Sequence, residues 1–398
     1  MMNRRAFLRL CALSAALLSG PRVARADAAT RLVEKQVFSL ERFEFELGNR
    51  VLPVKVGYET YGKLNSARDN AVLVCHYFAG TSHAAGKYRE DDPAPGWWDS
   101  LIGPGKAIDT DKYFVVSSDV LCNLNFYNPD VVTTGPASVD PATGKEYALD
   151  FPILTVKDIV TVQRELLNSL GIEKLAMVTG PSLGGLQAFA WARYFPEMVS
   201  RICPVISLPV IRPMMLMDPG QLAIDAIQLD PNWKGGNYYG GPAPSEGLLL
   251  AFKILLMSAQ SDPLLESRYG RQLADPERRP HDFLDGQYLV DKATEDLVTG
   301  RLHTFDANSY VYLSKAVTLF DLRGPGQTLE QALGEIKVPT LMINDSSDLM
   351  FGPEQSRETA SLLGQAELFL YDSGAGHLSG LTRTHLFADK MRDFLDRH

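Results

Sequence analysis

KLAMVTGPSLGGLQAFAWA, residues 174–192, is the stretch of this sequence that decides its fold. Its first part, residues 175–179, is apolar and ends at a glycine, which predicts a short buried strand. From Leu186 onward the sequence reads as a helix. Between the two lies GPSLG, residues 180–184, which fits G-x-S-x-G, the sharp turn that lifts a serine hydroxyl clear of a sheet. The flanking glycines leave space where strand and helix pass closest, and the serine must take a strained backbone conformation to project outward.

Ser182, at the centre of this turn, is the candidate nucleophile. The alternative is that the pentapeptide arises by chance and that Ser182 only caps the N-terminus of the helix, which serine does well. A strand before the motif and a helix after it form the context that the nucleophile turn requires. The sequence therefore favours the nucleophile.

Strand-like and helix-like segments alternate along most of the chain. Residues 34–59 alternate apolar and polar side chains around a Gly48-Asn49 turn, which predicts an antiparallel hairpin at a sheet edge. Residues 155–170 have helical periodicity behind a capping threonine. Further strands are expected within residues 70–80, 113–117, 202–207, 338–344 and 367–371, and a closing helix at 384–397. The alternation predicts the α/β class, with a mostly parallel sheet flanked by helices.

Residues 208–326 have a different texture, because they read as helical, are punctuated by proline and glycine, and contain no clear strand. We expect a helical lid here, inserted into a core of residues 29–207 and 327–398. The lid side chains that can line a pocket are Met214, Met215, Met217 and those of residues 248–257. Such residues belong more often to a plain hydrophobic core.

The N-terminal residues 1–28 are expected to be an export signal and not part of the fold. They begin with a basic segment, continue through the apolar run CALSAALLSG and end in small residues. NRRAFLR, residues 3–9, looks like a twin-arginine signal, which predicts a periplasmic or secreted protein. An ordinary secretory signal and an uncleaved anchor are the alternatives. No later apolar run is long enough to span a bilayer without charges.

Composition and cysteine spacing exclude several classes of partner. The 398 residues carry a net charge of −9, which gives no reason to expect nucleic acid or an anionic membrane as partner. Beyond the signal the chain keeps Cys75, Cys122 and Cys203, an odd number without metal-binding spacing, so we expect no disulfide framework. GGNYYGG, residues 235–241, lacks the lysine and the preceding strand of a phosphate loop. We therefore predict no cofactor and no metal.

A serine nucleophile needs a histidine to take its proton and a carboxylate to orient that histidine. After a turn of this kind the partners follow in the order Ser, Asp or Glu, His, each at the end of a strand. His377 comes directly after the strand expected at 367–371, and the alternative for it is a capping or exposed loop histidine. Asp345 and Asp348 both follow the strand at 338–344, so the residues alone leave the carboxylate open.

Two backbone amides must bind the oxyanion of the reacting carbonyl. One is expected from Leu183, directly after the nucleophile, and the other from Phe78, in the loop after the first buried strand. The alternative for this second segment, HYFAG, is a plain strand-to-loop turn.

Several ordered blocks resemble the homoserine O-acetyltransferase branch of the α/β-hydrolases. They include NAVLVCHYFAGTSHAAG, GPSLGGLQAFAWA, LDPNWKGGNYYG, FDANSYVYLSKAVTLFDL and SSDLMFGPEQSRE, and the resemblance runs from about residue 40 to the end. It implies the α/β-hydrolase fold with a helical lid, a Ser182, Asp348, His377 triad and often a homodimer built through the lid. Asp348 matches the aspartate of the family's SSD block, so the resemblance favours it over Asp345.

The sequence departs from this family in blocks that we expect to face the substrate. Leu378 stands where the acetyltransferases place an aspartate that reads homoserine, and Ile224 stands where they carry an arginine for its carboxylate. Their glycine-rich loop is replaced by a stretch that carries the bulky residues Asn125, Phe126 and Tyr127. Without both charged contacts, the ammonium and carboxylate of an amino acid would lie unpaired in a closed pocket, at a cost of several kcal/mol. The departures therefore argue against homoserine as the substrate.

Ester hydrolysis is the function that the sequence predicts, because an exported enzyme would not meet acetyl-CoA, whereas water is everywhere. The predicted substrate is a neutral small acyl ester, with Tyr77 and Leu378 as substrate-binding residues. The alternative is O-acyl transfer to an alcohol, which differs only in what reaches the acyl-enzyme. A third hypothesis, from another class, is a catalytically silent binding protein on a hydrolase scaffold.

Overall fold

An eight-stranded sheet forms the centre of the protein in a computed structural model that describes residues 32–397. The predicted export signal lies outside these residues. The strand order is β1-β2-β6-β3-β7-β8-β9-β10. The six strands from β6 to β10 run parallel, whereas β2 is antiparallel to both β1 and β6. The strands are β1 (Gln36–Glu44), β2 (Val51–Tyr61), β3 (Ala71–Val74), β6 (Phe114–Ser118), β7 (Leu175–Pro181), β8 (Ile202–Val205), β9 (Thr340–Asp345) and β10 (Ala366–Tyr371). The predicted α/β class and the edge hairpin are confirmed.

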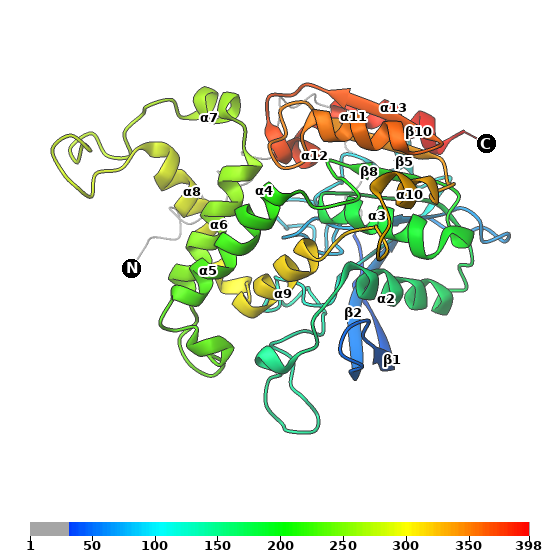
Figure 1. Cartoon of the computed structure of the whole chain (residues 1–398), viewed down its shortest axis with the longest axis horizontal. Coiled ribbons are helices and arrows are strands. Elements are labelled where there is room, and N and C mark those ends of the chain that lie inside the picture. Colours follow the sequence, from blue (N-terminus) through cyan, green and yellow to red (C-terminus); the bar gives the residue numbers. More distant parts are fainter. Residues whose placement is uncertain (1–31, 398) are drawn as a thin grey trace.

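The two faces of this sheet carry two separate cores, because side chains alternate along each strand. In β3, Leu73 packs with one core and Val72 and Val74 pack with the other, and all three are fully buried. The first core contains α2 (Val156–Ser169) and α3 (Leu183–Tyr194), and the second contains α13 (Ala388–Leu395). Figure 1 shows helices on both sides of the strands. Burial on both faces explains why the parallel strands read as continuous apolar runs.

The remaining elements of this part are short. They are β4 (Ile102–Gly103) and β5 (Ile108–Asp109), which pair with each other, the turns η1 (Ala148–Asp150), η2 (Pro196–Met198), η6 (Gly376–Leu378) and η7 (Thr384–Leu386), and the helices α11 (Pro353–Leu362) and α12 (Ser379–Thr382). The closing helix is shorter than predicted. It begins only at Ala388, because the buried Phe387 before it has non-helical backbone angles of φ −127° and ψ −2°.

Helices fill the chain between β8 and β9, and we call residues 206–339 the helical segment. It comprises α4 (Pro213–Met215), η3 (Leu216–Gln221), α5 (Leu222–Leu229), η4 (Lys234–Gly236), α6 (Ser245–Ala259), α7 (Asp262–Arg268), α8 (Leu289–Thr299), η5 (Leu302–Thr304), α9 (Ala307–Thr318) and α10 (Leu329–Gly334). The chain returns to the sheet after α10. In Figure 1 the helices α4 to α9 lie together at one side of the sheet. None of the described helices alone has the length and composition to cross a membrane. The helices α6 and α7 meet these two criteria only when they are taken together, and the pair is bent by 106°.

Asp306 ties the helical segment together, because its fully buried carboxylate caps α9 and collects donors from a distant loop. It accepts hydrogen bonds from the Ser309 amide at 2.7 Å, from the Tyr239 hydroxyl at 3.2 Å and from the Tyr238 hydroxyl. Burial, the largest effect, raises the pKa of Asp306 despite these donors. The network accounts for two of the blocks that carry the family resemblance, one with Asp306 and one with the two tyrosines.

A second buried ionic cluster lies where β2 meets the loop that follows β3. The fully buried Glu59 carboxylate lies 3.1 Å from Lys35 Nζ and 3.0 Å from His83 Nδ1. It also accepts hydrogen bonds from the hydroxyls of Tyr61 and Tyr88, at 2.8 and 2.6 Å. Burial, the largest effect, would raise the pKa of Glu59, but His83, Lys35 and the Tyr88 hydroxyl together lower it to about 2. The cluster fastens residues 82–88 to the sheet.

We expect Glu59→Gln to lower the free energy of unfolding at pH 7 by about 3 kcal/mol, since it replaces a buried charged acceptor by a neutral amide. Among the described residues Lys35 would then pair only with Asp119, 3.4 Å away. A carboxyl whose pKa is lower in the folded state stabilises the fold above its ordinary pKa, near 4.5, and this contribution disappears as the pH falls towards 2. The loss caused by the mutation should therefore shrink across this window. Urea unfolding of both proteins at several pH values measures it.

Glu367 offers a matched control for this prediction. Its pKa is also lowered to about 2, by hydrogen bonds from Arg397 and Lys390, but 40% of its side chain is exposed. Solvent screens such a pair, so Glu367→Gln should cost less than about 1 kcal/mol. Equal losses in the two variants would show that burial of Glu59 does not set its contribution.

Candidate active site

The turn between β7 and α3 presents Ser182 at the carboxyl end of the central strands. Ser182 has φ 56° and ψ −117°, so the predicted strained backbone conformation is confirmed. A Cβ added to Gly180 or Gly184 would lie 2.1 or 2.2 Å from the Cys75 carbonyl oxygen. Only glycine fits these positions, because such approaches are far inside van der Waals contact.

The helix after this turn begins at Leu183, three residues before the predicted start at Leu186. Two glycines at its first turn hid this start, because glycine is a poor helix former. They are required by packing: a Cβ on Gly185 would lie 2.3 Å from Ser207 Cβ. The low helix propensity of glycine is therefore outweighed here by packing, because the helix passes close to the chain that follows β8.

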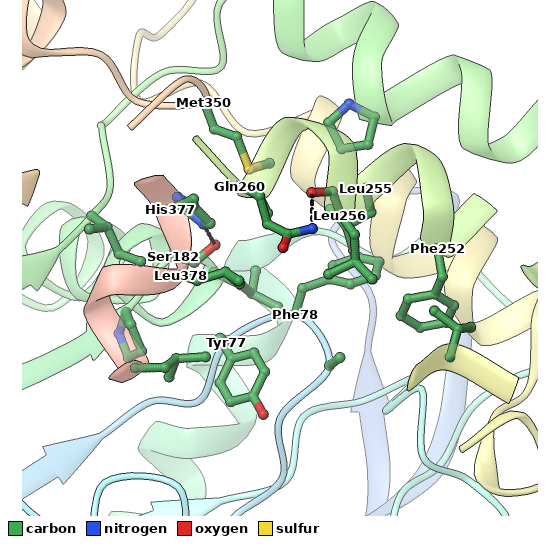
Figure 2. Close-up of a pocket in the computed structure, with 18 of the residues that line it drawn as sticks. Tyr77, Phe78, Ser182, Phe252, Leu255, Leu256, Gln260, Met350, His377 and Leu378 are labelled. Carbon is green, nitrogen blue, oxygen red and sulfur yellow. Dashed lines mark hydrogen bonds between the residues drawn. The ribbon is translucent and has the colours of Figure 1, made fainter. Parts of the chain in front are cut away.

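Three side chains from separate loops meet at this turn and form a hydrogen-bonded chain. The Ser182 hydroxyl lies 2.8 Å from His377 Nε2, and His377 Nδ1 lies 2.8 Å from a carboxylate oxygen of Asp348. Since the carboxylate can only accept, Nδ1 carries the hydrogen and Nε2 accepts from the serine. Figure 2 shows the serine and the histidine joined at the edge of a pocket. This arrangement can pass the serine proton to the imidazole and stabilise the resulting charge.

Asp348 is held in place by the backbone that follows it. Its second carboxylate oxygen accepts hydrogen bonds from the amides of Met350 and Phe351, at 2.8 and 3.2 Å. The side chain is buried, so only the oxygen facing His377 is left for the imidazole. The Phe351 ring packs 5.6 Å from the imidazole between centroids and excludes water from this side.

Asp345, the other carboxylate that the sequence leaves open, does not touch His377. It accepts hydrogen bonds from the Ser347 amide and hydroxyl, at 2.9 and 2.8 Å, and from the Ser373 hydroxyl. The Ser347 hydroxyl in turn accepts from the Gly376 amide at 3.0 Å. Asp345 therefore fastens the loop that carries Asp348 to the loop that carries His377.

The amides of Phe78 and Leu183 are the predicted oxyanion donors. Within residues 32–397 neither amide donates a hydrogen bond to another group. Leu183 directly follows Ser182 at the start of α3, where backbone amides have no partner inside the helix. Both residues line the same pocket as the serine, and Figure 2 shows Phe78 on its wall. Two free amides beside the nucleophile are what an oxyanion needs.

A buried polar network holds the loop of Phe78, and the sequence did not reveal this role of its members. The Asn123 amide donates to His76 Nε2 at 3.2 Å and to the Gly80 carbonyl at 3.1 Å. The Asn125 amide donates to the carbonyls of Ala79 and Gly80, each at 3.3 Å. From the helical segment, Arg301 reaches the Asn125 side-chain oxygen at 3.3 Å. The sequence signal was present, because these asparagines stand in the loop that departs from the family pattern.

His76 is part of this network and not of the proton-transfer chain. It is fully buried, and its Nδ1 lies 2.7 Å from the Tyr77 carbonyl, to which it donates. Burial, the largest effect, lowers the pKa of His76, and its Nε2 accepts from the Asn123 amide. The loop of Phe78 is thus fixed by a hydrogen-bond network in which Arg301 is the charged member.

The pocket in front of Ser182 has a volume of about 350 Å³, within the range of small-ligand sites. Tyr77, Phe78, Leu183, His377 and Leu378 all line it. Phe252, Leu255 and Leu256 of α6 form the facing wall in Figure 2, as expected of residues 248–257. The sheet and the helical segment together therefore enclose this space.

Several expectations about pocket residues are wrong. Met215 lines the pocket, but Met214 and Met217 point away from it and are 71% and 63% exposed. Ile224 is buried inside the helical segment, on α5, and does not line the pocket. Apolar spacing could not reveal this, because a helix with apolar residues on several faces gives no sign of which face meets the pocket.

The loop that replaces the family's glycine-rich block also lies outside the pocket. Asn125 is buried in the network under the oxyanion loop, and Tyr127 is 48% exposed. The Tyr127 amide donates to the Thr304 carbonyl at 3.1 Å, so this loop contacts the helical segment. Bulk in this loop supports the site and does not narrow it.

Cysteine offers no second nucleophile in the described chain. Cys75, Cys122 and Cys203 are buried and free, and burial raises the pKa of each thiol, that of Cys203 to about 12. No group of three or more metal-binding side chains comes together among residues 32–397. Ser182 is thus the nucleophile that the geometry of the site favours.

The comparisons with known proteins agree with the fold. A family model described as alpha/beta hydrolase fold matches residues 133–384. The homoserine O-acetyltransferase of Deferribacter desulfuricans is 40% identical over 91% of this chain and 95% of its own, and that of Geobacter sulfurreducens is 39% identical over 92% and 98%. Both relatives therefore match over nearly their whole length.

Two solved structures are similar to this chain at comparable identity but carry different activities in their names. Homoserine O-acetyltransferase from Bacillus anthracis has a TM-score of 0.88 and 42% identity, covering 92% of this chain and 98% of that one. Esterase E22 has a TM-score of 0.86 and 40% identity, covering 92% and 100%. A leucine-to-aspartate mutant of that esterase has also been solved.

Proposed function

Because this chain belongs to the homoserine O-acetyltransferase family of α/β-hydrolases, we propose that it transfers an acyl group from an ester to Ser182 and then to water. The family supports acyl transfer as the kind of chemistry. Water as the acceptor and the catalytic roles of the individual residues are proposals that go beyond what the family supports.

The proposed reaction has two halves. Ser182 Oγ attacks the ester carbonyl while His377 Nε2 takes the hydroxyl proton, and the amides of Leu183 and Phe78 bind the oxyanion. The protonated imidazole, stabilised by Asp348, gives its proton to the departing alcohol, which leaves an acyl-serine. A water molecule then loses a proton to His377 and attacks this ester, and the acid departs as Ser182 regains its proton.

The observation that carries hydrolysis is the absence of a carboxylate from the pocket. No aspartate or glutamate is among the described residues that line it, and Leu378 follows the histidine directly. The ammonium of homoserine would be buried here without a partner, which costs several kcal/mol. The second argument against homoserine, the loss of an arginine for its carboxylate, does not hold in the structure. Ile224 lies outside the pocket, whereas Arg268 and Arg301 line it.

O-acyl transfer to an alcohol is the second candidate, and the names of the curated relatives favour it. They are homoserine O-acetyltransferases at about 40% identity over almost the whole chain. The esterase structure at 40% identity shows that hydrolases also occur at this level of similarity. Both candidates use the same serine and differ only in the acceptor.

Location and assembly remain proposals of the same kind. The basic and apolar sequence of residues 1–28 supports export, which would separate the enzyme from cytoplasmic acetyl-CoA. Self-association through the helical segment would cover large apolar side chains that are exposed there, among them Met214, Met217, Leu250 and Met257.

The acceptor is tested by following one acetyl pool. The mature protein is given p-nitrophenyl acetate or acetyl-CoA, with and without homoserine, and acetate and O-acetylhomoserine are quantified. We expect acetate from the ester and no O-acetylhomoserine. Homoserine acetylation that exceeds hydrolysis would contradict water as the acceptor and support the second candidate.

Leu378→Asp tests the physical reason for this outcome, because it places a carboxylate where an ammonium can meet it. Homoserine acetylation should appear in Leu378→Asp and not in Leu378→Asn, which has the same shape without the charge. If both variants or neither acetylate homoserine, the missing carboxylate is not what excludes it.

A further inference from the structure

Arg268 is a charged side chain of the pocket that has no partner among the residues that the structure describes. It is the last residue of α7, is half-buried and lines the same pocket as Ser182. Among residues 32–397 no hydrogen bond, ion pair or ring contact to its guanidinium is present. Arg301, the other arginine of the pocket, is engaged with Asn125 and stacks 5.1 Å from the Phe305 ring.

The surroundings of Arg268 favour a negatively charged ligand. The pocket residues from α8 are Ala293, Thr294 and Leu297, none of which carries a negative charge. Because no carboxylate of the described chain lines the pocket, nothing there competes for the guanidinium. In an apolar space an unpaired cation attracts an anion far more strongly than it does in water.

A purely structural role for Arg268 must be weighed against this. A cation at the C-terminal end of a helix is favourable, because it faces the negative end of the helix dipole. That role requires no ligand, and it predicts an effect on stability that is independent of the charge of the substrate. The two roles can therefore be separated by substrates that differ only in charge.

We propose that Arg268 binds a carboxylate carried by the ester, at a distance from the bond that is cleaved. This inference rests on the proposed function and names its substrate class, an ester that also bears a free carboxylate. Guanidinium matches a carboxylate with two parallel hydrogen bonds, and one unpaired arginine balances one such charge. The substrate then departs from the neutral ester that the sequence predicts.

The test compares mono-p-nitrophenyl suberate with its methyl ester, which has the same chain without the charge. In the wild type, KM for the acid should be about tenfold below KM for the methyl ester. Arg268→Gln should raise KM for the acid by about ten- to a hundredfold and leave KM for the methyl ester within about twofold. Arg268→Lys should fall between them, since lysine keeps the charge but not the paired hydrogen bonds.

Arg271, three residues further on, is the matched control. It does not line the pocket, and its guanidinium hydrogen-bonds the Tyr288 hydroxyl at 2.7 Å and stacks 5.0 Å from that ring. Arg271→Gln should leave the preference for the acid unchanged. Equal changes for both esters in Arg268→Gln, or the same loss of preference in Arg271→Gln, would overturn the proposal.

Binding of suberate separates this inference from the proposed function. Calorimetry on Ser182→Ala, which needs no turnover, should show suberate binding that Arg268→Gln weakens about tenfold or more in the same background. Turnover of the methyl ester without any preference for the acid would sink the inference alone. Absence of all ester turnover would sink the proposed function, and suberate binding would still decide the role of Arg268.

Discussion

Ser182→Ala is expected to lower kcat/KM for p-nitrophenyl butyrate by about 10⁴- to 10⁶-fold. In serine enzymes built on this arrangement, removal of the nucleophile costs about that much, because the oxyanion donors and binding alone give little rate. The Ser182 hydroxyl is the one that lies 2.8 Å from His377 Nε2, at the mouth of the pocket. Initial rates of p-nitrophenol release measure the effect, and far-ultraviolet circular dichroism checks the fold.

Ser207→Ala is the matched control for this variant. Ser207 is a fully buried serine beside the first turn of α3, its hydroxyl has no partner within the described residues, and it does not line the pocket. Its loss should change kcat/KM by less than about threefold, because it removes no contact of the reacting groups. If Ser182→Ala lowered kcat/KM by less than tenfold, the result would contradict the covalent mechanism.

Asp348→Asn is expected to lower kcat by about 10³- to 10⁴-fold with little change in KM. The asparagine amide would face His377 Nδ1 and favour the tautomer that carries its hydrogen on Nε2, which then cannot take the proton of Ser182. The two backbone amides that bind the other oxygen of Asp348 keep the side chain in place, so the fold should survive. Steady-state kinetics on p-nitrophenyl esters separates kcat from KM.

Asp345→Asn provides the contrast, since Asp345 lies only three residues before Asp348 but its carboxylate bonds to Ser347 and Ser373 and not to His377. Its effect should fall mainly on the free energy of unfolding, by about 1–3 kcal/mol, with kcat reduced by about tenfold or less. A larger kinetic loss in Asp345→Asn than in Asp348→Asn would exchange the roles of the two carboxylates.

The parts of the site that are local in sequence could be predicted. The turn at Ser182 is set by its own glycines, whose neighbours sit within 2.1 and 2.2 Å of where a Cβ would lie. His377 was indicated because each partner of the serine follows a strand, and parallel strands end at one edge of the sheet. The same logic placed Phe78 and Leu183 beside the nucleophile.

The direction in which each side chain points could not be predicted, and this direction decides which other residues belong to the site. Asp345 ends β9 and Asp348 follows it, and the residues alone did not show that Asp348 faces His377 whereas Asp345 faces two serines. Asn125 was expected in the pocket because its block departs from the family, yet its side chain bonds to the loop of Phe78. Arg268 drew no attention, since only the folded pocket shows that it lacks a partner.

The most direct test of the account is to trap the acyl-enzyme. The wild-type protein is mixed with p-nitrophenyl butyrate, quenched in acid within milliseconds and digested, and the peptides are mapped by mass spectrometry. The account predicts one added butyryl group on the peptide that contains Ser182, which disappears as the ester is exhausted. Butyrylation of a different side chain that forms and decays at the turnover rate would contradict it.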